Sequence, residues 1–414
     1  MEGNPAADTK RLLVLGAGAG QLGLLEAARA RGLFVVAVDR NPAAPGFRFA
    51  DRRAIISVED EPQIDRLASA EHVDGLIAPG IDWPVAIAAR IAERQVLPHP
   101  IDPATAVLAT SKLRQRERFV EAGVPHPRHV VCSTVDEARS AAADFGYPCV
   151  VKAPDRQGQK GLVLVRRRRQ LADAFALALG ESRSNVVLVE ELVPGREVTV
   201  NAFSVAGRFT PLTVTDRIVA EPPAFGVALA HVWPSSLSPD EVGGAVEAAR
   251  QAAAALGVED GPTYTQVVVG ERGSHVVELA ARLGGGHDAE LCEAVLGVDL
   301  NGLALASALG EPVDEERLRP VTRAGGGCTR FLVPEPGRLV GVEGLDEALS
   351  VEGVAWAVAY PEPGTVLGPL RRGSDRAGAV RAVGSSREEA VARAGRAADC
   401  VRFVVADVPA EAVV

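Results

Sequence analysis

Short apolar runs alternate with amphipathic segments over the first hundred residues of the chain. The apolar runs predict buried strands and cover residues 12–15, 34–38, 54–58 and 75–78. Residues 21–31 and 85–93 have the periodicity of amphipathic helices. Strands that alternate with helices pair in parallel through right-handed crossovers. The pattern therefore predicts an α/β protein that begins with a Rossmann-like parallel-sheet domain over residues 1–108.

A smaller unit is predicted over residues 109–194. A helix over 112–121 ends at Gly123, and two prolines mark a linker after it. Thr134-Val-Asp-Glu137 is a capping box that opens the next helix. The elements expected after it are strands over 149–152, 162–165 and 186–190 and a helix near 171–179.

The second half of the chain predicts an antiparallel core and a C-terminal subdomain. Ser238-Pro-Asp-Glu241 is a second capping box, and its helix ends at Gly257. Residues 267–269 and 276–279 flank a glycine-containing turn and predict an antiparallel hairpin. The core is expected over 195–327. An α+β subdomain with a helix over 388–401 is expected over 328–414.

Composition narrows the class of protein. A length of 414 residues predicts two to four domains, and 47% hydrophobic with 24% charged residues is typical of soluble globular proteins. The net charge of −10 argues against general binding to nucleic acid or an anionic membrane. No apolar run reaches membrane-spanning length, and no signal-peptide pattern is found. Five cysteines without metal-binding spacing predict reduced thiols in a cytoplasmic protein.

A glycine motif near the start satisfies the dinucleotide-binding fingerprint. Gly16-Ala-Gly18-Ala-Gly20-Gln-Leu-Gly23 follows a predicted strand and opens a helix, and Asp39 ends the next strand. The motif alone leaves NAD or FAD binding open. The alternative is that any doubly wound sheet needs glycine where strand meets helix.

Two lysines further along predict a phosphate site. Lys152 ends an apolar strand, and a buried lysine is costly unless an anion pairs with it. The loop after it contains Gly158, Lys160 and Gly161 and could fold its amides over phosphates, although by itself it could also be an exposed hairpin loop. Lys112 begins a helix, where a cation is unfavourable unless an anion lies nearby.

Spaced acids and a late arginine complete an ordered series. Glu190-Glu191 leave a predicted strand, and Glu197 follows a Pro-Gly turn. The series closes with Glu278-Leu-Ala-Ala-Arg282-Leu-Gly-Gly-Gly286, in which the glycines indicate close backbone approach to a ligand. Each acid alone is compatible with a solvated strand end, so the joint order carries the argument.

This order and spacing resemble the ATP-grasp superfamily of carboxylate–amine ligases, in particular the L-amino-acid ligases and the ATPase subunit of phosphoribosylaminoimidazole carboxylase. The resemblance covers residues 11–403 and implies ATP and Mg²⁺ as cofactors, with Mn²⁺ as a substitute. It also implies an ATP-grasp fold in which residues 109–194 carry a nucleotide lid. The nucleotide-binding residues it implies are Lys112, Lys152, Gly158, Lys160, Gly161, Glu190, Glu191, Leu192, Val193 and Glu197. In these relatives, the N-terminal glycine loop contacts the acceptor substrate rather than a dinucleotide.

The implied metal site departs from the family pattern. The family places magnesium on an acid in one hairpin strand and on Glu-x-Asn in the next. Here Glu278 is present, but the Asn position is Ala280 and the upstream position is Gln266. A glutamine oxygen can ligate, but it lacks the negative charge that attracts a divalent ion. The acids that could compensate are Asp216, Glu221 and Asp288.

The resemblance also implies the transfer site. Its catalytic residues would be Lys152, Lys160, Arg282 and His231. An arginine there would stabilise the transferring phosphoryl group. His231 has an apolar neighbour on each side, so a packed structural role is the alternative. The substrate-binding residues it suggests are Asp82, Trp83, Gly285, Gly286 and His287.

The sequence therefore predicts an ATP-dependent ligase that activates a small carboxylate, in particular an amino acid, as an acyl phosphate and transfers it to an amine. Carboxyphosphate or formyl-phosphate chemistry is the alternative within enzymes. A degenerate ATP-binding protein is the alternative from another class, because of Gln266 and Ala280. The expected partners are small-molecule substrates and a second copy in a homodimer, with neither nucleic acid nor membrane.

Overall fold

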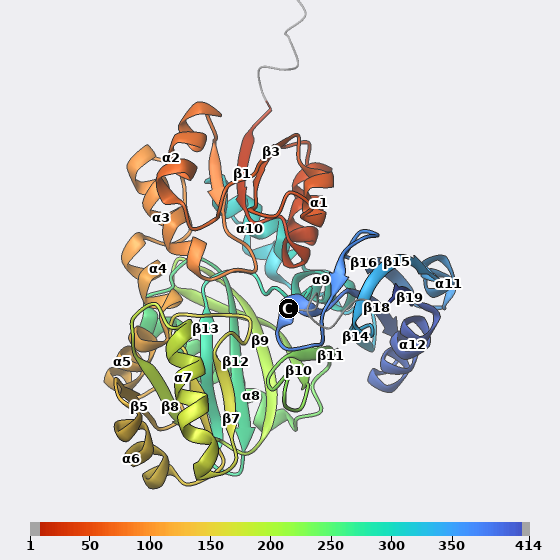
Figure 1. Ribbon diagram of the computed structural model, residues 1–414. Helices are drawn as coiled ribbons and strands as arrows, with labels where there is room; N and C mark the ends of the chain where they lie inside the picture. Colours follow the sequence, from red (N-terminus) through yellow and green to blue (C-terminus); the bar gives the residue numbers. More distant parts are fainter. Residues whose placement is uncertain (1–8, 408–414) are drawn as a thin grey trace, which may run out of the picture.

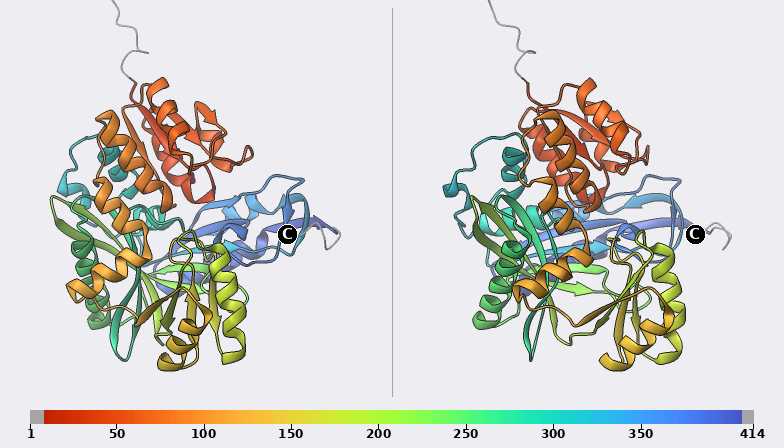
Figure 2. Two further views of the ribbon diagram at one scale, coloured as in Figure 1. Left: turned by 60° about the vertical axis from the view of Figure 1, so that its left-hand side comes forward. Right: turned by 90° about the vertical axis from the view of Figure 1, so that its left-hand side faces the viewer.

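Within the described part of the chain, four β-sheets and their helices build the protein (Figure 1). The computed structural model describes residues 9–407. The N-terminal domain and the four-stranded sheet formed by residues 129–191 lie at opposite ends of the molecule. The eight-stranded sheet lies between them (Figure 2). This is the mixed α/β architecture that the sequence predicts.

The first sheet is parallel, as predicted, with strand order β3-β2-β1-β4. Its strands are β1 (Arg11–Leu15), β2 (Phe34–Val38), β3 (Arg52–Ala54) and β4 (Gly75–Ile77). Its helices are α1 (Leu22–Ala30), α2 (Glu61–Ala70), α3 (Trp83–Gln95) and α4 (Pro103–Thr110). The strand predicted over 54–58 is wrong, because β3 ends at Ala54. Helices α2 and α4 were not predicted, although Asp60 and Asp102 cap them through side-chain hydrogen bonds.

The second sheet, in the predicted central unit, is antiparallel with strand order β5-β8-β6-β7. Its strands are β5 (His129–Cys132), β6 (Cys149–Lys152), β7 (Leu162–Val165) and β8 (Val187–Glu191), and its helices are α6 (Val135–Phe145) and α7 (Leu171–Glu181). Helix α5 (Lys112–Ala122) precedes the sheet and ends at Gly123 in the left-handed conformation. The capping box at Thr134 is confirmed.

The third and largest sheet is antiparallel and has the order β13-β12-β9-β10-β11-β14-β18-β16. Its strands are β9 (Arg196–Val205), β10 (Arg208–Val219), β11 (Ala228–Trp233), β12 (Gly261–Gly270), β13 (Gly273–Ala280), β14 (Gly326–Leu332), β16 (Val354–Ala359) and β18 (Gly378–Gly384). Helices α8 (Pro239–Leu256), α9 (Asp288–Leu296) and α10 (Leu300–Ala308) accompany it. The predicted hairpin is β12–β13, and the capping box at Ser238 is confirmed.

The last part of the chain adds strands to this sheet and builds a small one of its own. The small sheet has the order β17-β15-β19, formed by β15 (Gly337–Glu343), β17 (Val366–Leu367) and β19 (Arg402–Ala406). Helices α11 (Leu345–Ser350) and α12 (Arg387–Cys400) belong to the same region. The proposed division at 327/328 falls inside β14, so the large sheet is continuous across it.

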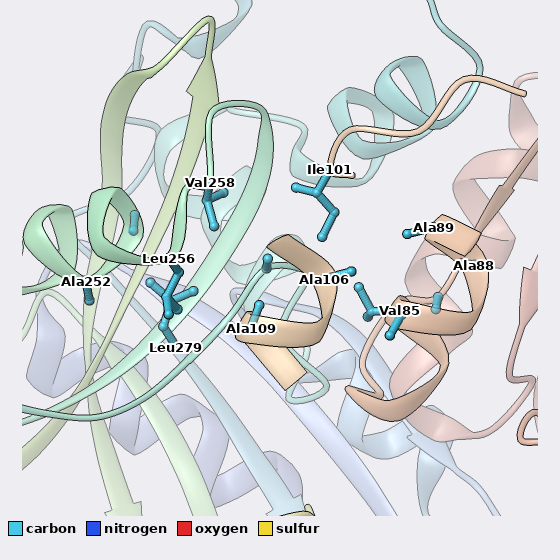
Figure 3. Packing of buried hydrophobic residues seen from close by; sticks show 14 of the residues in the cluster. Val85, Ala88, Ala89, Ile101, Ala106, Ala109, Ala252, Leu256, Val258 and Leu279 are labelled. Atoms are coloured by element: carbon cyan, nitrogen blue, oxygen red, sulfur yellow. The ribbon is translucent and has the colours of Figure 1, made fainter. Parts of the chain in front are cut away.

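A hydrophobic cluster fixes the N-terminal domain to the central core. Val85 on α3 and Ala106 on α4 belong to the same buried cluster as Leu256 on α8 and Leu279 on β13 (Figure 3). This packing holds the carboxyl ends of the first sheet in a defined place relative to the β12–β13 hairpin.

All five cysteines are free thiols, and four of them are buried. Among residues 9–407, no helix has the length and apolar character needed to cross a membrane.

Candidate active site

A cleft of about 750 Å³ lies where four parts of the chain meet. The N-terminal domain contributes its glycine loop and residues 80–82, and the loop after β6 contributes residues 157–159. Strands of the large sheet and residues between 360 and 377 complete its lining. Many of the residues that the sequence singles out therefore face one shared space.

Lys152 belongs to a buried ionic triad next to this cleft. Its Nζ lies 2.6 Å from one carboxylate oxygen of Glu190, and Arg116 Nη2 lies 2.7 Å from the other. Burial disfavours the charged form of Lys152 and lowers the pKa of its ammonium group to about 8. Burial also opposes ionisation of Glu190, but Arg116 and Lys152 outweigh it and lower the pKa of Glu190 to about 2. The anion that pairs with Lys152 is thus a side chain of the protein itself, which the sequence did not reveal.

Lys112, the second lysine, pairs with a carboxylate of the β12–β13 hairpin. Its Nζ lies 2.7 Å from Glu278 Oε1 and donates a 2.9 Å hydrogen bond to the carbonyl of Arg156. Burial opposes ionisation of Glu278, yet Lys112 and then Lys152 hold the pKa of Glu278 below its usual value. The ammonium, the carboxylate and the loop after β6 are therefore connected.

The β12–β13 hairpin carries the residues of the expected metal site. Gln266 is directly opposite Glu278, and Tyr264 is directly opposite Ala280. Residues two apart on a strand share a face, so all four side chains project from one face, and all four line the cleft. The structure therefore brings Gln266 and Glu278 together.

Arg282 follows the hairpin and binds the N-terminal domain. Its Nη2 lies 2.5 Å from Asp82 Oδ1, and its guanidinium stands over the Tyr264 ring. Trp83 lies at the start of α3, is 39% exposed, and packs under the guanidinium of Arg183. Asp82 and Arg282 line the cleft, whereas Trp83 lines a smaller pocket beside it.

His231 and Asp288 form a buried pair at the base of the cleft. His231 Nδ1 lies 2.7 Å from Asp288 Oδ1, while Nε2 has no hydrogen-bond partner within residues 9–407. A Cβ on Gly286 would lie 2.5 Å from His231 Cε1, so glycine is required for this approach. His287 Nε2 is 2.8 Å from the Tyr360 hydroxyl. Burial lowers the pKa of His287 to about 4, so that imidazole is neutral at pH 7.

The loop after β6 covers the cleft. Gln157 accepts a hydrogen bond from the backbone N–H of Asp82, and a Cβ on Gly373 would lie 3.5 Å from Gln159 Oε1. Gly158 and Gly161 have φ of 64° and 68°, which glycine adopts without strain. The loop thus contacts the N-terminal domain on one side and the C-terminal region on the other.

Lys160, on the same loop, stands among other cations. Burial lowers the pKa of Lys160, and the nearby charges of Arg372 and Arg40 lower it further. It lines the small pocket beside the main cleft. Two acids lie in the same surroundings, since Glu181 opposes the shift of the Lys160 pKa and Asp375 pairs with Arg372.

Glu191 and Glu197 form ion pairs with arginines of the protein itself. Arg128 Nε and Arg272 Nη2 lie 3.0 and 3.1 Å from the two oxygens of Glu191. Arg217 Nη1 lies 2.5 Å from Glu197 Oε1. Leu192 and Val193 follow β8 directly. The adenine and ribose contacts expected for residues 190–193 and 197 stay predictions.

Arg217 and Arg376 were missed by the sequence reasoning. Arg217 is buried on β10, faces the cleft and donates to the carbonyl of Gly226. Arg376 stacks 3.7 Å from the centre of the Phe331 ring and donates 2.8 Å to the carbonyl of Gly373. The close spacing of Arg371, Arg372 and Arg376 was the signal available.

The glycine fingerprint at the start has a packing explanation. A Cβ on Gly20 would lie 3.1 Å from the carbonyl oxygen of Gly285, and one on Gly23 would lie 1.3 Å from Glu290 Oε1. Asp39 accepts hydrogen bonds from the backbone N–H groups of Ala17 and Asn41. These glycines let the N-terminal domain approach the loop that carries Gly284–Gly286.

The acids considered as compensating metal ligands have other partners. Asp216 holds Arg387 and Ser235, and Glu221 holds Arg166. Within the described residues, no group of three or more His, Cys, Asp and Glu side chains is arranged to hold a metal ion.

Comparison with known proteins identifies the family. The model of the family described as carbamoyl-phosphate synthase L chain, ATP-binding domain, matches residues 111–316. The model of L-amino acid ligase C-terminal domain 2 matches residues 330–406. A formate-dependent phosphoribosylglycinamide formyltransferase of Paraburkholderia xenovorans is 30% identical, over 98% of both chains. The chain belongs to the ATP-grasp superfamily of carboxylate–amine ligases, which are ADP-forming enzymes.

Solved structures share the fold along nearly the whole chain. An L-amino acid ligase from Bacillus licheniformis matches with a TM-score of 0.79 and 21% identity, over 96% of this chain and 99% of that one. N5-carboxyaminoimidazole ribonucleotide synthetase from Thermotoga maritima matches with a TM-score of 0.73 and 20% identity, over 96% and 100%. These likenesses confirm the ATP-grasp fold class.

Proposed function

We propose that this protein uses ATP to activate a small carboxylate, in particular that of an amino acid, and transfers the acyl group to an amine. One observation carries the proposal. Arg376 reaches the wall of the cleft, and among residues 9–407 no carboxylate lies within ion-pair distance of its guanidinium. Its neighbours Arg217 and Arg282 already hold Glu197 and Asp82. A substrate carboxylate is the anion that fits this unmatched charge.

ATP fits the part of the cleft beside the β12–β13 hairpin. Lys112 and Lys152 lie beside the hairpin, and the loop with Gly158 and Gly161 offers backbone amides to phosphate oxygens. Glu278 and Gln266 present one carboxylate and one amide oxygen to the cleft, which fits a single Mg²⁺ that takes its remaining ligands from phosphates and water. A magnesium ion held there would offset negative charge on the phosphates.

The reaction would proceed in two balanced steps. A carboxylate oxygen attacks the γ-phosphorus of ATP, the bond to the β-phosphate oxygen breaks, and ADP leaves. The amine nitrogen then attacks the acyl carbon, and inorganic phosphate leaves with its electron pair. Arg282 and Lys160 would stabilise the charge on the transferring phosphoryl group.

His231 would take the proton that the amine loses during the second step. Asp288 accepts from Nδ1, which leaves Nε2 as the free nitrogen of a ring that lines the cleft. An acid that orients the ring and an imidazole that accepts a proton form a familiar acid–base arrangement. The alternative is a packed structural role for His231, which the variant Asp288→Asn tests.

An amino acid is the preferred substrate because the C-terminal residues match the L-amino acid ligase model, and these residues include Arg376. Formate or bicarbonate is the second candidate, favoured by the relative that is 30% identical over the full length. The homodimer expected from the resemblance stays a prediction, which the mass of the protein in solution would test.

The deciding experiment measures ADP release by the purified protein with ATP, Mg²⁺ and pooled amino acids, with hydroxylamine as the amine. ADP release that depends on the pool, together with hydroxamate formation, is the expected result. Release with formate or bicarbonate instead would transfer the proposal to the second candidate. ATP binding without turnover on any carboxylate, under Mg²⁺ and Mn²⁺, would contradict it and favour a degenerate ATP-binding protein.

A further inference from the structure

The face of the β12–β13 hairpin sets how many metal ions can accompany ATP. Four side chains project from this face into the cleft: Tyr264 and Gln266 on β12, and Glu278 and Ala280 on β13. Their backbone positions are fixed by continuous pairing on both sides of a bulge between Gln266 and Val267. A site for two divalent ions on this hairpin would have to draw its protein ligands from these positions.

Only one of the four is an anion. Ala280 offers a methyl group and Gln266 a neutral amide. Tyr264 offers a phenol, whose ring lies under the Arg282 guanidinium. Magnesium and manganese bind hard oxygen ligands, and each added carboxylate strengthens the attraction. The hairpin therefore supplies the charge for one cation.

Only one of the two carboxylate oxygens of Glu278 has a partner among residues 9–407. Its Oε1 is bound to Lys112 Nζ at 2.7 Å, whereas Oε2 has no hydrogen-bond partner in the described part of the chain. A carboxylate that bridges two metal ions uses both oxygens. With one oxygen held by an ammonium group, Glu278 has a single oxygen left for a metal.

The ammonium is itself firmly positioned. Lys112 is buried, and its second hydrogen bond goes to the carbonyl of Arg156 on the loop that covers the cleft. The other acids near the hairpin hold partners of their own: Glu197 holds Arg217, Asp82 holds Arg282, and Asp288 holds His231. None of them is left to release Lys112 from Glu278 or to hold a second ion.

We propose that the nucleotide binds to this protein with one divalent cation, held by Glu278, and that the Lys112 ammonium supplies the positive charge on the other side of that carboxylate. The proposal rests on the proposed use of ATP and specifies its metal requirement. The changes at Gln266 and Ala280 then reduce the number of ions rather than abolish nucleotide binding.

Equilibrium dialysis of the full-length protein with Mn²⁺ and a non-hydrolysable ATP analogue tests this directly. We expect one Mn²⁺ per bound nucleotide at saturation and an electron paramagnetic resonance spectrum of isolated ions. Two ions per nucleotide, or the spin coupling of ions about 4 Å apart, would overturn the proposal while leaving the proposed function intact. Absence of nucleotide binding would overturn both.

Two variants identify the side chains responsible. The double variant Gln266→Glu/Ala280→Asn adds a carboxylate and an amide to the same face. We expect it to bind two Mn²⁺ ions per nucleotide. A ratio that stays at one would contradict the assignment to these positions. Glu278→Gln should weaken binding of the single cation by about tenfold or more, because one carboxylate charge is lost. Unchanged affinity would remove Glu278 from the proposal. The wild-type ratio decides the number of ions even if a variant fails to fold.

Discussion

Glu190 bridges Lys152 and Arg116 inside the protein, with its two oxygens 2.6 and 2.7 Å from the two cations. All three side chains are buried. Arg116 also donates to the carbonyl of Val277 on β13, so the triad connects α5, the central unit and the hairpin. The lysine that the sequence assigns to phosphate is thus held in place before any phosphate arrives.

Glu190→Gln should destabilise the fold strongly. Removing the central charge leaves two buried cations without compensation, which typically costs about 3–5 kcal/mol. Urea unfolding followed by circular dichroism would measure the loss. Glu247→Gln is the matched control, because Glu247 makes an exposed pair with Arg250 and should change stability very little. Equal effects from the two changes would refute the structural role of the triad.

Stability should fall with acidification because of His287. Burial lowers its pKa to about 4 in the folded protein, although nearby Glu290 opposes the shift. The unfolded chain, with an ordinary histidine, takes up its proton at higher pH. Protonation therefore favours unfolding as pH falls from about 6.5 to 4. His287→Gln should reduce this slope, measured as melting temperature against pH. A variant with an unchanged slope would contradict the assignment.

Arg376→Ala should raise KM for the carboxylate substrate by about 10–100-fold, the usual cost of losing hydrogen bonds to a charged group. KM for ATP should change little, because the proposed phosphate lysines, Lys112 and Lys152, contact Glu278 and Glu190, whereas Arg376 contacts Phe331 and Gly373. Initial rates with each substrate varied in turn would separate the two constants. The control is Arg330→Ala, an exposed arginine on β14. A rise confined to KM for ATP would contradict the proposed carboxylate site.

Asp288→Asn tests the acid–base pair. Losing the acid that orients His231 should lower kcat by about 10²-fold or more while ATP binding persists. A kcat that stays unchanged in Asp288→Asn would indicate that the pair serves packing alone.

Gly23→Ala tests the packing role of the glycine fingerprint. The new methyl group would overlap Glu290, and overpacking of this kind costs about 1–3 kcal/mol. Gly395→Ala, on α12 with nothing within 4 Å of the added Cβ, should instead raise stability by up to about 1 kcal/mol. Thermal unfolding of the two variants would compare them. Tight binding of NAD or FAD by the wild type, visible in its absorbance, would restore the dinucleotide interpretation.

The sequence predicted those parts of the fold whose signals are local. The capping boxes at Thr134 and Ser238 and the left-handed glycines after α5 and α8 lie where the pattern indicates. Helix α10 was missed because it is apolar nearly all around, as a helix inside a core can be. The strand order of the large sheet could not be predicted from local patterns either, since β14 pairs with β11 across almost a hundred residues.

The sequence predicted which motifs contribute residues to the candidate site, but it did not predict which acids and cations form ion pairs there. Lys112, Gln266 and Glu278 do lie together beside the cleft. What the sequence could not give is which acid holds which cation, since Glu190 and Arg116 are 74 residues apart. Arg376 lies just before β18, outside the ordered series of lysines, acids and glycines, so only the folded chain shows that it reaches the cleft.

The continuity of the large sheet bears on how the chain folds. Strand β14 is hydrogen-bonded to β11 on one side and to β18 on the other, so the strands that follow residue 325 complete a sheet begun before residue 200. Without them, β11 would present an open edge of unpaired backbone groups, the usual template for aggregation. Although a separate family model describes residues 330–406, this region shares its largest sheet with the core, so we expect the two to unfold in one transition rather than as separate modules.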